Sequence, residues 1–474
     1  MQLHRLSLRQ KTIAMSAAVF RLLGERSLQR APTAGALRIA APAATARSLH
    51  VGEPSRVADK SYKFVVCGAG PGGLAVASSL GRRFGEKSIA IIEPADYHYY
   101  QPMWTLVGCG IKTLEDSRRK MADFMPPQAD WLQTSVTGFR PNENIVETAD
   151  GSTVKYDYLI VAVGLQIDYG KIKGLPEALE DPNSMVSTNY SSLYAPKTFE
   201  NVRRFKGGHA LFTFPTIPIK CPGAPQKIMY LAEDYWRRNG MKENTKISFN
   251  TTLGVIFPVK KYADVLQGIV KERGITVNYQ HKLLEVLGDK REAVFELLAE
   301  DKQGETITVP YDFLHATPPM APLDFMVGQP ISDQLGWVDV DPKTLQHKKY
   351  ANIFSLGDCS SVPTSKTAAA VAAESRVLKR NLLEVVKGGS PRLEYDGYTS
   401  CPLITSMDKA ILAEFDFNVM PLETFPIDQG PPRRWVYRLK KDFMPGLYWH
   451  MLLRGWWGGP GFARKLMHLG DHSK

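Results

Sequence analysis

The chain has 474 residues, which is too long for a single hydrophobic core, so two or three domains are expected. Its composition, with 44% hydrophobic and 23% charged residues, is ordinary for a soluble globular enzyme. No apolar run reaches the roughly 18 residues that a transmembrane helix needs. The net charge of +11 is concentrated in residues 1–50 and 430–474, which carry +7 each, and the nearly neutral body between them argues against a nucleic-acid-binding protein.

The first 58 residues predict a mitochondrial transit peptide and a disordered lead. Residues 1–50 are rich in Arg, Ser, Ala and Leu, and their only acidic residue is Glu25. This composition is typical of a targeting peptide that is removed after import. The alternative is a plain disordered basic tail.

A dinucleotide-binding unit is predicted directly after this leader. An apolar strand over Lys63–Cys67 is followed by a glycine-rich turn, a helix over Leu74–Phe84, a strand over Ser88–Ile92 and an acid, Glu93. The glycines allow a tight turn and let a pyrophosphate approach the helix N-terminus, while the acid would bind ribose hydroxyls. The predicted cofactor-binding residues of this unit are Gly68, Gly70, Pro71, Gly72, Gly73 and Glu93.

Four later segments extend this cofactor site. Tyr97–Cys109 is aromatic and irregular, which suits either a wall against a flat ring system or an aromatic cluster in the core. Tyr156–Gly164 and Asn352–Asp358 are apolar strands that resemble the second and third signatures of FAD-binding oxidoreductases with two dinucleotide-binding domains. Lys366–Ala373 resembles the helix whose N-terminus faces the flavin ring in those proteins. The resemblance implies FAD contacts from Gly164, Gly357, Asp358, Lys366, Thr367, Ala368 and Ala369.

Residues 200–335 predict a second domain of similar type that has lost its nicotinamide site. A strand over Ala210–Phe214 and a helix from Pro225 to Gly240 flank the position of the expected glycine loop, but that loop is rich in proline and carries Cys221. A later strand, Tyr311–Thr317, ends in two prolines instead of a glycine. Side chains and prolines keep phosphates away from the backbone. The other predicted elements are strands over Lys246–Asn250 and Ile275–Tyr279, a helix over Tyr262–Arg273 and a hairpin over Leu283–Leu298.

Residues 395–474 form a third region. From Pro431 onward, basic residues alternate with Trp, Tyr and short apolar segments. This pattern is what an interfacial membrane anchor requires, because aromatic and basic side chains lie at the boundary between lipid and water. The alternatives are a helical pair that packs on the core and a homodimer face.

The five cysteines are too few and too scattered for a secreted disulfide scaffold or a structural zinc site, and no metal site is predicted. Cys221 and Cys401 each precede a proline, and two cysteines placed over a flavin would act as a two-electron relay. A helix N-terminus with Lys220 and Lys227 nearby would lower the pKa of Cys221. Cys67 and Cys109 are interpreted as buried packing residues. Cys359, which directly follows the predicted flavin-binding Asp358, is a minor candidate for a redox role.

From Lys63 to Leu469 the chain resembles mitochondrial sulfide:quinone oxidoreductases. The motifs that carry the resemblance are GAGPGG, IIEP, YQPMWTLVG, IKCPGAPQKIMYL, KYADVLQ, LHATPPM, GWVDVD, PTSKTAAAVAA, YTSCPLIT and LRGWWGGP. The resemblance implies non-covalent FAD, oxidation of hydrogen sulfide, ubiquinone as electron acceptor, glutathione as a sulfur acceptor, and the inner mitochondrial membrane as the location. It further implies that sulfide attacks Cys401 and forms a persulfide there, and that Cys221 becomes the thiolate that donates electrons to the flavin. Gln101 and Val136 are assigned to FAD on the same basis.

The sequence therefore predicts an α/β protein with two Rossmann-like dinucleotide-binding domains and a C-terminal region. The FAD domain is expected over residues 60–199 and 336–394, the second domain over 200–335, and a quinone- and membrane-associating region over 395–474. Two other functions are considered. An NADH:quinone oxidoreductase of the same fold would need a nicotinamide site at residues 210–240, and a flavin-bearing binding protein would leave Cys221 and Cys401 unexplained.

Overall fold

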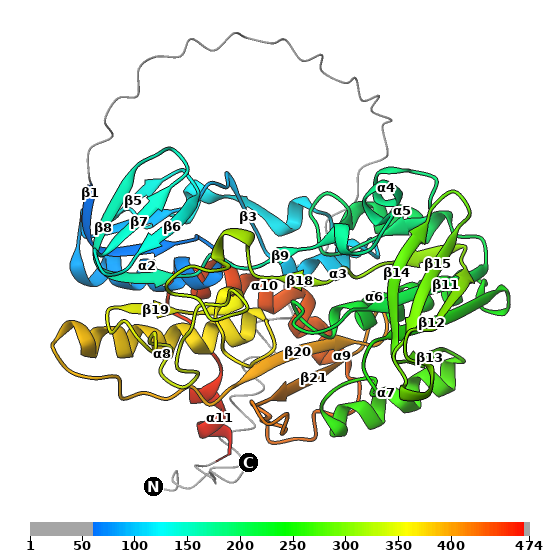
Figure 1. Cartoon of the computed structure of the whole chain (residues 1–474). Coiled ribbons are helices and arrows are strands. Elements are labelled where there is room, and N and C mark those ends of the chain that lie inside the picture. The colour runs from blue at the N-terminus through cyan, green and yellow to red at the C-terminus, as the bar shows by residue number, and fades with distance from the viewer. Residues whose placement is uncertain (1–59, 469–474) are drawn as a thin grey trace, which may run out of the picture. The chain divides into compact units, whose positions relative to one another are not determined.

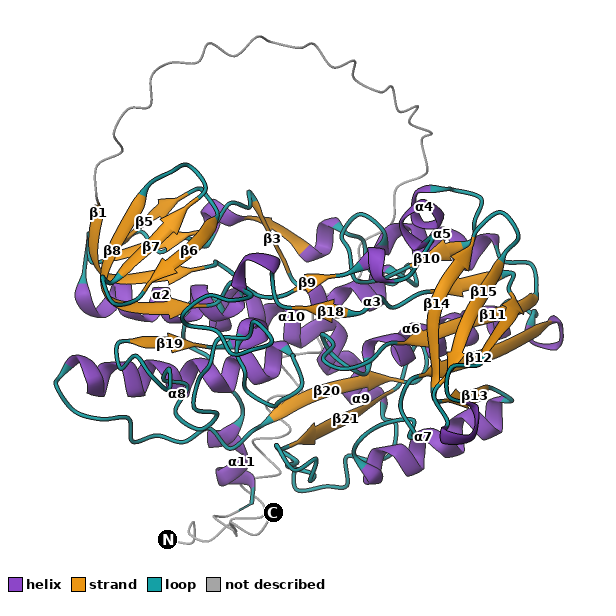
Figure 2. Ribbon diagram, in the orientation of Figure 1, coloured by secondary structure: helices purple, strands orange, loops and turns teal. Residues whose placement is uncertain are grey.

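The computed structural model describes residues 60–468, so the predicted transit peptide lies outside the described residues. The described residues fall within one contact unit, residues 57–474. Two largely parallel sheets with flanking helices make up most of this unit, which confirms the predicted α/β fold (Figures 1 and 2). None of the described helices is long and apolar enough to cross a membrane.

The first sheet holds the start of the described chain and one late strand. Its strands are β1 (Lys60–Cys67), β2 (Ile89–Ile92), β5 (Ala129–Leu132), β6 (Val136–Arg140), β7 (Ile145–Thr148), β8 (Thr153–Val161) and β19 (Ile353–Ser355). The order β5-β2-β1-β8 is parallel throughout. The first half of β8 pairs with β7 in antiparallel fashion, and its second half pairs with β19 in parallel. The ends of β1 and β19 both pair with Val161 of β8, so β19 ends at the same edge of the sheet as the glycine-rich turn that follows β1.

Two helices, α2 (Pro71–Phe84) and α8 (Ala368–Val386), pack against each other beneath this sheet in the view of Figure 1. Pro71 starts α2, where its missing N–H costs nothing. Thr367 caps α8, because its hydroxyl accepts a hydrogen bond from the Ala370 backbone N at 3.0 Å. The helix α2 therefore begins after the end of β1, and α8 begins after the end of β19, both at the carboxyl edge of the sheet.

The second sheet is fully parallel, in the spatial order β10 (Val186–Ser187), β17 (Phe313–His315), β11 (Gly208–Phe214), β12 (Thr245–Thr251) and β13 (Thr276–Tyr279). The helices of this part are α4 (Leu175–Glu180), α5 (Ala195–Arg204), α6 (Ala224–Arg238) and α7 (Lys260–Arg273). An antiparallel sheet lies alongside, built from β14 (His281–Leu287), β15 (Glu292–Leu297) and β16 (Thr306–Pro310). The predicted domain boundary at residue 200 falls inside α5, and the sheet already includes β10.

Several short elements connect the two sheets. They are β3 (Tyr97–Tyr99) with β4 (Arg118–Lys120), β9 (Gln166–Ile167) with β18 (Met320–Ala321), and the one-turn helix α3 (Trp104–Val107). Figure 1 shows β3, β9, β18 and α3 between the first sheet and the second.

A hairpin of β20 (Thr399–Ile404) and β21 (Ala410–Phe415) packs against α6 and α8. The chain then forms the helices α9 (Arg434–Arg438), α10 (Met444–Leu447) and α11 (Gly461–Met467), with π-helical turns at Leu439–Phe443 and Tyr448–Leu452. The hairpin brings the end of the chain back to α6, the helix that follows the proline-rich loop.

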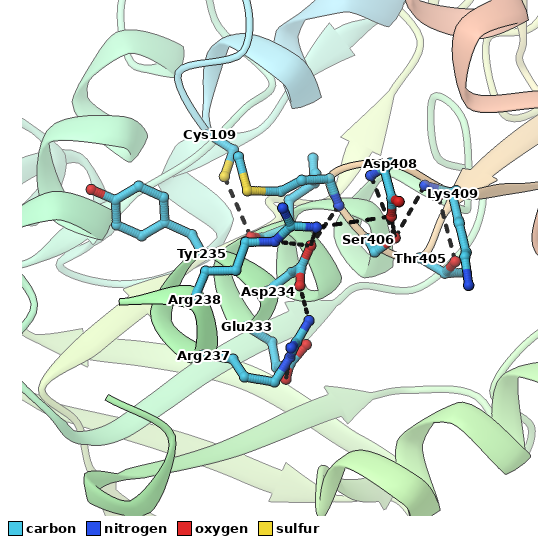
Figure 3. A network of polar contacts seen from close by, with 12 residues as sticks. Cys109, Glu233, Asp234, Tyr235, Arg237, Arg238, Thr405, Ser406, Asp408 and Lys409 are labelled. Atoms are coloured by element: carbon cyan, nitrogen blue, oxygen red, sulfur yellow. Dashed lines mark hydrogen bonds and ion pairs between the residues drawn. The ribbon is translucent and has the colours of Figure 1, made fainter. Parts of the chain in front are cut away.

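One buried carboxylate ties the tip of this hairpin to α6 (Figure 3). Asp234 is completely buried and accepts a hydrogen bond from the Met407 backbone N at 2.8 Å. Arg237 and Arg238 also bind it, the latter with Nε at 3.1 Å. Because Met407 lies in the turn between β20 and β21, this contact fixes the hairpin along the helix.

Candidate functional site

The glycine-rich turn after β1 builds one end of a large cavity. Gly68 has a φ of +97°, and a Cβ there would overlap the Ala162 carbonyl oxygen, so only glycine fits. A Cβ on Gly73 would overlap the Gly68 carbonyl oxygen, and its absence lets α2 start close to β1. Glu93 follows β2, and its Oε2 accepts a hydrogen bond from the Ala69 backbone N at 2.8 Å. The turn, the start of α2 and this carboxylate fit the pyrophosphate and ribose of a dinucleotide.

The opposite end comes from the connection between β19 and α8. The Gly357 N–H donates to Glu374 Oε2 at 2.7 Å, and burial raises the pKa of Glu374 to about 7. The carboxylate of Asp358 lies 4.0 Å from Lys220 Nζ. Burial lowers the pKa of Lys366, an effect that Asp358 opposes, and Lys366 Nζ donates to a backbone carbonyl at 2.6 Å.

These elements enclose a cavity of about 370 Å³, here called the first cavity. Most of the predicted cofactor-binding residues line it: Gly68, Gly70, Pro71, Gly72, Glu93, Gln101, Gly164, Gly357, Asp358, Lys366, Thr367, Ala368 and Ala369. Two do not. Gly73 packs against Gly68 behind the lining, and Val136 is buried on β6.

The aromatic segment after β2 supplies one wall of the first cavity. It folds into β3, a turn of 3₁₀ helix over Gln101–Met103 and α3. Tyr99, Tyr100, Trp104 and Thr105 line the cavity, while Leu106 and Val107 of α3 are buried in the core. The sequence suggested either a wall against a flat ring system or an aromatic cluster in the core, and each interpretation describes part of this segment.

The two predicted redox cysteines meet at this cavity. Cys221 precedes α6, Cys401 lies on β20, and their Sγ atoms are 3.3 Å apart. Cys221 has a φ of +49°, a left-handed conformation that costs a non-glycine residue about 1–2 kcal/mol. Its backbone N–H is fixed by the Lys366 carbonyl at 2.9 Å. A Cβ on Gly223 would lie 2.5 Å from Cys401 Sγ, so this glycine is what lets β20 approach.

The surroundings of the pair favour one thiolate, at Cys221. The hydrogen bond with Cys401 holds the pKa of Cys221 well below its usual range, and Lys227, whose Nζ lies 3.1 Å from Cys221 Sγ, acts in the same direction against the effect of burial. The same hydrogen bond raises the pKa of Cys401. Lys220 instead points to Gln101 Oε1 at 3.4 Å and to Asp358. Of the two lysines predicted to lower the pKa of Cys221, Lys227 therefore contributes and Lys220 does not, while the hydrogen bond with Cys401 is the larger cause.

Lys440, from the π-helical turn after α9, is a residue of the site that sequence reasoning missed. It is buried, lines the first cavity and donates to the Pro102 carbonyl at 3.2 Å. Burial, with repulsion from Lys227, lowers the pKa of Lys440 to about 7. Its sequence neighbours read as an exposed basic stretch, so the sequence holds no signal for its burial.

A second cavity of about 220 Å³ adjoins the first and is mostly apolar. The residues that line both cavities are Tyr100, Ala368, Ala369, Ser400, Met444 and Tyr448. The Tyr448 hydroxyl lies 2.6 Å from His98 Nε2, and His98 Nδ1 lies 3.1 Å from the Ala69 carbonyl oxygen. Burial lowers the pKa of His98 to about 4, so a neutral imidazole connects the glycine-rich turn to the shared wall.

Comparison with known proteins decides the family. Residues 62–197 match the family model of pyridine nucleotide-disulphide oxidoreductases. A mitochondrial sulfide:quinone oxidoreductase of Mus musculus is 51% identical over 92% of this chain and 95% of its own length. The chain belongs to the mitochondrial sulfide:quinone oxidoreductase family. A family member from Schizosaccharomyces pombe is 41% identical over 86% of this chain and 94% of its own length.

A solved structure shares the fold. The sulfide:quinone oxidoreductase from the bacterium Aquifex aeolicus superposes with a TM-score of 0.70 at 17% identity, and the match covers 88% of this chain and 96% of its own. Membership of the sulfide:quinone oxidoreductase family confirms the predicted resemblance, and makes the chain an oxidoreductase with a flavin cofactor.

Proposed function

We propose that this chain oxidises hydrogen sulfide at Cys401 and Cys221 and passes two electrons through its flavin to ubiquinone. The single observation that carries this proposal is the 3.3 Å approach of the two sulfurs at a cavity that fits a dinucleotide, in a chain of the sulfide:quinone oxidoreductase family. When bound, the flavin accepts an electron pair from a thiolate and returns it to a second substrate.

The two cysteines take different roles because their surroundings differ. Sulfide attacks the Cys401 sulfur of an oxidised pair, so that an S–S bond forms at Cys401 and the bond to Cys221 breaks. Cys221 leaves as the thiolate, which Lys227 stabilises at 3.1 Å and which lines the first cavity. A thiol acceptor then removes the outer sulfur of Cys401, and for an acceptor RSH and a quinone Q the sum is H₂S + RSH + Q → RSSH + QH₂.

The cofactor is FAD, bound without a covalent link. The glycine-rich turn and Glu93 fit the adenosine diphosphate half of FAD. Gly164 and the residues between Gly357 and Ala369 that line the first cavity fit its flavin half. Acid precipitation tests this directly. The flavin should be released into the supernatant and should co-elute with FAD on chromatography, whereas flavin that stays with the precipitate, or elutes as FMN, would be incompatible with the assignment.

Ubiquinone occupies the second cavity, which adjoins the first through Tyr100, Tyr448 and the start of α8. Glutathione is the thiol acceptor. The relatives are named as mitochondrial proteins, and the chain is placed in the mitochondrion. The exposed apolar side chains near the C-terminus, such as Trp456 and Phe462, rest on the inner membrane surface, from which a prenylated quinone enters.

An anaerobic mixing experiment tests the proposal. Sulfide should bleach the flavin absorbance of the purified protein rapidly, and NADH should not. Cys221→Ser and Cys401→Ser should each abolish bleaching by sulfide while the flavin stays bound. Bleaching by NADH but not by sulfide would instead establish the NADH:quinone oxidoreductase, and bleaching by neither would favour a binding protein. Sulfide-driven turnover in either serine variant would refute the relay.

A further inference from the structure

The second cavity has one polar wall. Its other walls are apolar and aromatic, but Tyr398, Ser400, Glu414 and Thr424 place polar side chains on one side. All four belong to the hairpin of β20 and β21 or to the residues that flank it. Glu414 is the one carboxylic acid among the described residues that line this cavity, and only 3% of it is exposed.

The register of the hairpin separates this wall from the cysteine pair. Ser400 is paired with Glu414, and Cys401 is paired with Ala413. Directly paired residues share a face of the hairpin, and neighbours along a strand point to opposite faces. Ser400 and Glu414 therefore face the second cavity, whereas Cys401 lines neither cavity and faces Cys221. Sulfur chemistry and the polar wall occupy opposite faces of the same two strands.

Glu414 is held by neutral donors only. The Tyr398 hydroxyl donates to Oε1 at 2.5 Å, the Thr424 backbone N donates to Oε2 at 2.7 Å, and Gln429 Nε2 donates to Oε2 at 2.8 Å. Burial raises the pKa of Glu414, and these hydrogen bonds oppose that rise. The group can therefore both hold a proton and, once it has lost the proton, remain a stabilised carboxylate.

The surrounding charges are paired with each other and not with Glu414. Lys261 of α7 binds Glu423 at 2.7 Å and Asp428 at 2.8 Å. Arg464 of α11 binds Asp396 at 2.7 Å and lies 5.2 Å from the centre of the Tyr398 ring. The other titratable group that faces Glu414 is Tyr262, whose hydroxyl contacts the Glu414 backbone carbonyl at 3.2 Å.

We propose that Glu414 delivers a proton, through the Tyr398 hydroxyl, to an oxygen of the quinone in the second cavity; the inference rests on the proposed function. Conversion of a quinone to a quinol adds two electrons and two protons. The electrons and one proton come from the reduced cofactor, and the second proton must cross an apolar cavity. When Glu414 is protonated, its hydrogen bond with Tyr398 reverses, so that the carboxyl O–H donates to the phenol oxygen and the phenol O–H is free to donate to the quinone. The O–H bond of Tyr398 then breaks as the quinone O–H forms, and the Glu414 O–H bond breaks as its proton replaces that of Tyr398. Water later reprotonates the carboxylate.

Ser400 completes the wall. Its hydroxyl is buried, lies near the Tyr398 hydroxyl and lowers the pKa of that group, makes no hydrogen bond of regular geometry among the described residues, and lies where the two cavities meet. A buried hydroxyl without a partner is costly unless a ligand binds it. The Ser400 hydroxyl therefore donates to the same quinone oxygen and orients it toward Tyr398.

Glu414→Gln tests the proton donor, because it keeps the shape of the side chain and cannot act as an acid. The protein is reduced anaerobically with sulfide and then mixed with a water-soluble short-chain ubiquinone. Reduction by sulfide should be unchanged, whereas reoxidation by the quinone should slow by about 10²-fold. Glu423→Gln, which removes a neighbouring carboxylate outside the cavity, should reoxidise like the wild type. Reoxidation of Glu414→Gln at the wild-type rate would overturn the proposal.

Tyr398→Phe and infrared spectroscopy give readouts that a purely structural role would not move. The Tyr398 hydroxyl stabilises the carboxylate, so its removal should raise the pKa of Glu414. The carbonyl band of a protonated carboxyl, followed against pH without any substrate, should persist to higher pH in Tyr398→Phe and should be missing in Glu414→Gln. An unchanged band in both variants would contradict the proposal. A wild-type protein that sulfide fails to reduce would refute the proposed function instead, and would leave the infrared result interpretable.

Discussion

The thiolate at Cys221 is favoured first by the hydrogen bond with Cys401 and then by a neighbouring ammonium group. Lys227 lies within hydrogen-bond distance of Cys221, and its charge favours the ionised sulfur. In Lys227→Met this part of the stabilisation is lost while the effect of burial stays, so the pKa of Cys221 should rise and the share of thiolate at neutral pH should fall, although the hydrogen bond with Cys401 remains. Ultraviolet thiolate absorbance, followed against pH in the reduced protein, measures the shift directly.

The matched control is Lys220→Met. Lys220 is next to Cys221 in the chain, but its ammonium group points to Gln101 and Asp358. The titration of Cys221 should therefore stay as in the wild type. A larger shift in Lys220→Met than in Lys227→Met would mean that sequence proximity, and not the observed geometry, sets the pKa of Cys221.

Gly223 is predicted to be as important to the pair as the cysteines. In Gly223→Ala the added methyl group would lie 2.5 Å from Cys401 Sγ, so β20 must move away from the loop. The two cysteines should then fail to form a disulfide, and thiol titration after mild oxidation should find both free. Gly268→Ala on α7, where an added Cβ meets nothing within 4 Å, should oxidise normally. Normal disulfide formation in Gly223→Ala would contradict this prediction, because it would show that β20 can shift enough to accommodate the added methyl group.

The sequence predicted individual site residues best where the signal is local. Gly68, Glu93 and Asp358 line the first cavity, because glycine turns and acids at strand ends have a fixed meaning at the carboxyl edge of a parallel sheet. The burial of Lys440 and the need for a glycine at position 223 depend on how distant segments approach one another. No spacing in the sequence encodes that approach.

At the scale of elements, the same contrast holds. The strand and helix predicted over Ala210–Phe214 and Pro225–Gly240 correspond to β11 and α6, because an apolar run and a helix of ordinary length are local patterns. The hairpin of β20 and β21 was not predicted, although it carries Cys401. Its position is set by packing against α6 and α8 and by Asp234, far away in the sequence.

Asp234→Ala should weaken that packing. The change removes the partner of the Met407 N–H and leaves Arg237 and Arg238 without their buried acceptor (Figure 3). The free energy of unfolding should fall by about 2–3 kcal/mol, less than for a fully buried pair because both arginines reach solvent. Denaturant unfolding of the flavin-loaded protein measures this change.

Asp408→Ala provides the comparison at the same turn. Asp408 pairs with Arg434 at 3.1 Å, and the side chains are 38% and 75% exposed, respectively. An exposed pair contributes less than about 1 kcal/mol, so the loss should be small. Equal losses in the two variants would show that the buried position of Asp234 does not matter to the hairpin.

At the scale of the whole molecule, the C-terminal segment serves two regions at once. Tyr448 and Lys440 reach into the first cavity, whereas Phe462 and Leu466 on α11 leave 74% and 55% of their surface exposed. The second cavity lies between these regions, lined by residues of both α10 and α11. A hydrophobic quinone that enters past α11 would thus reach the wall shared with the first cavity without crossing bulk water.

Phe462→Asp with Leu466→Asp should therefore detach the protein from lipid. Burial of each side chain in a membrane surface contributes about 1.5–3 kcal/mol, so binding to vesicles that contain cardiolipin should weaken by at least tenfold per residue. Leu193→Asp with Leu335→Asp, which changes two side chains that are 69% and 71% exposed elsewhere, should bind like the wild type. Both double variants should keep sulfide-driven bleaching, because neither touches the cysteine pair. Wild-type sedimentation of the α11 variant with vesicles would mean that another face of the protein meets the membrane.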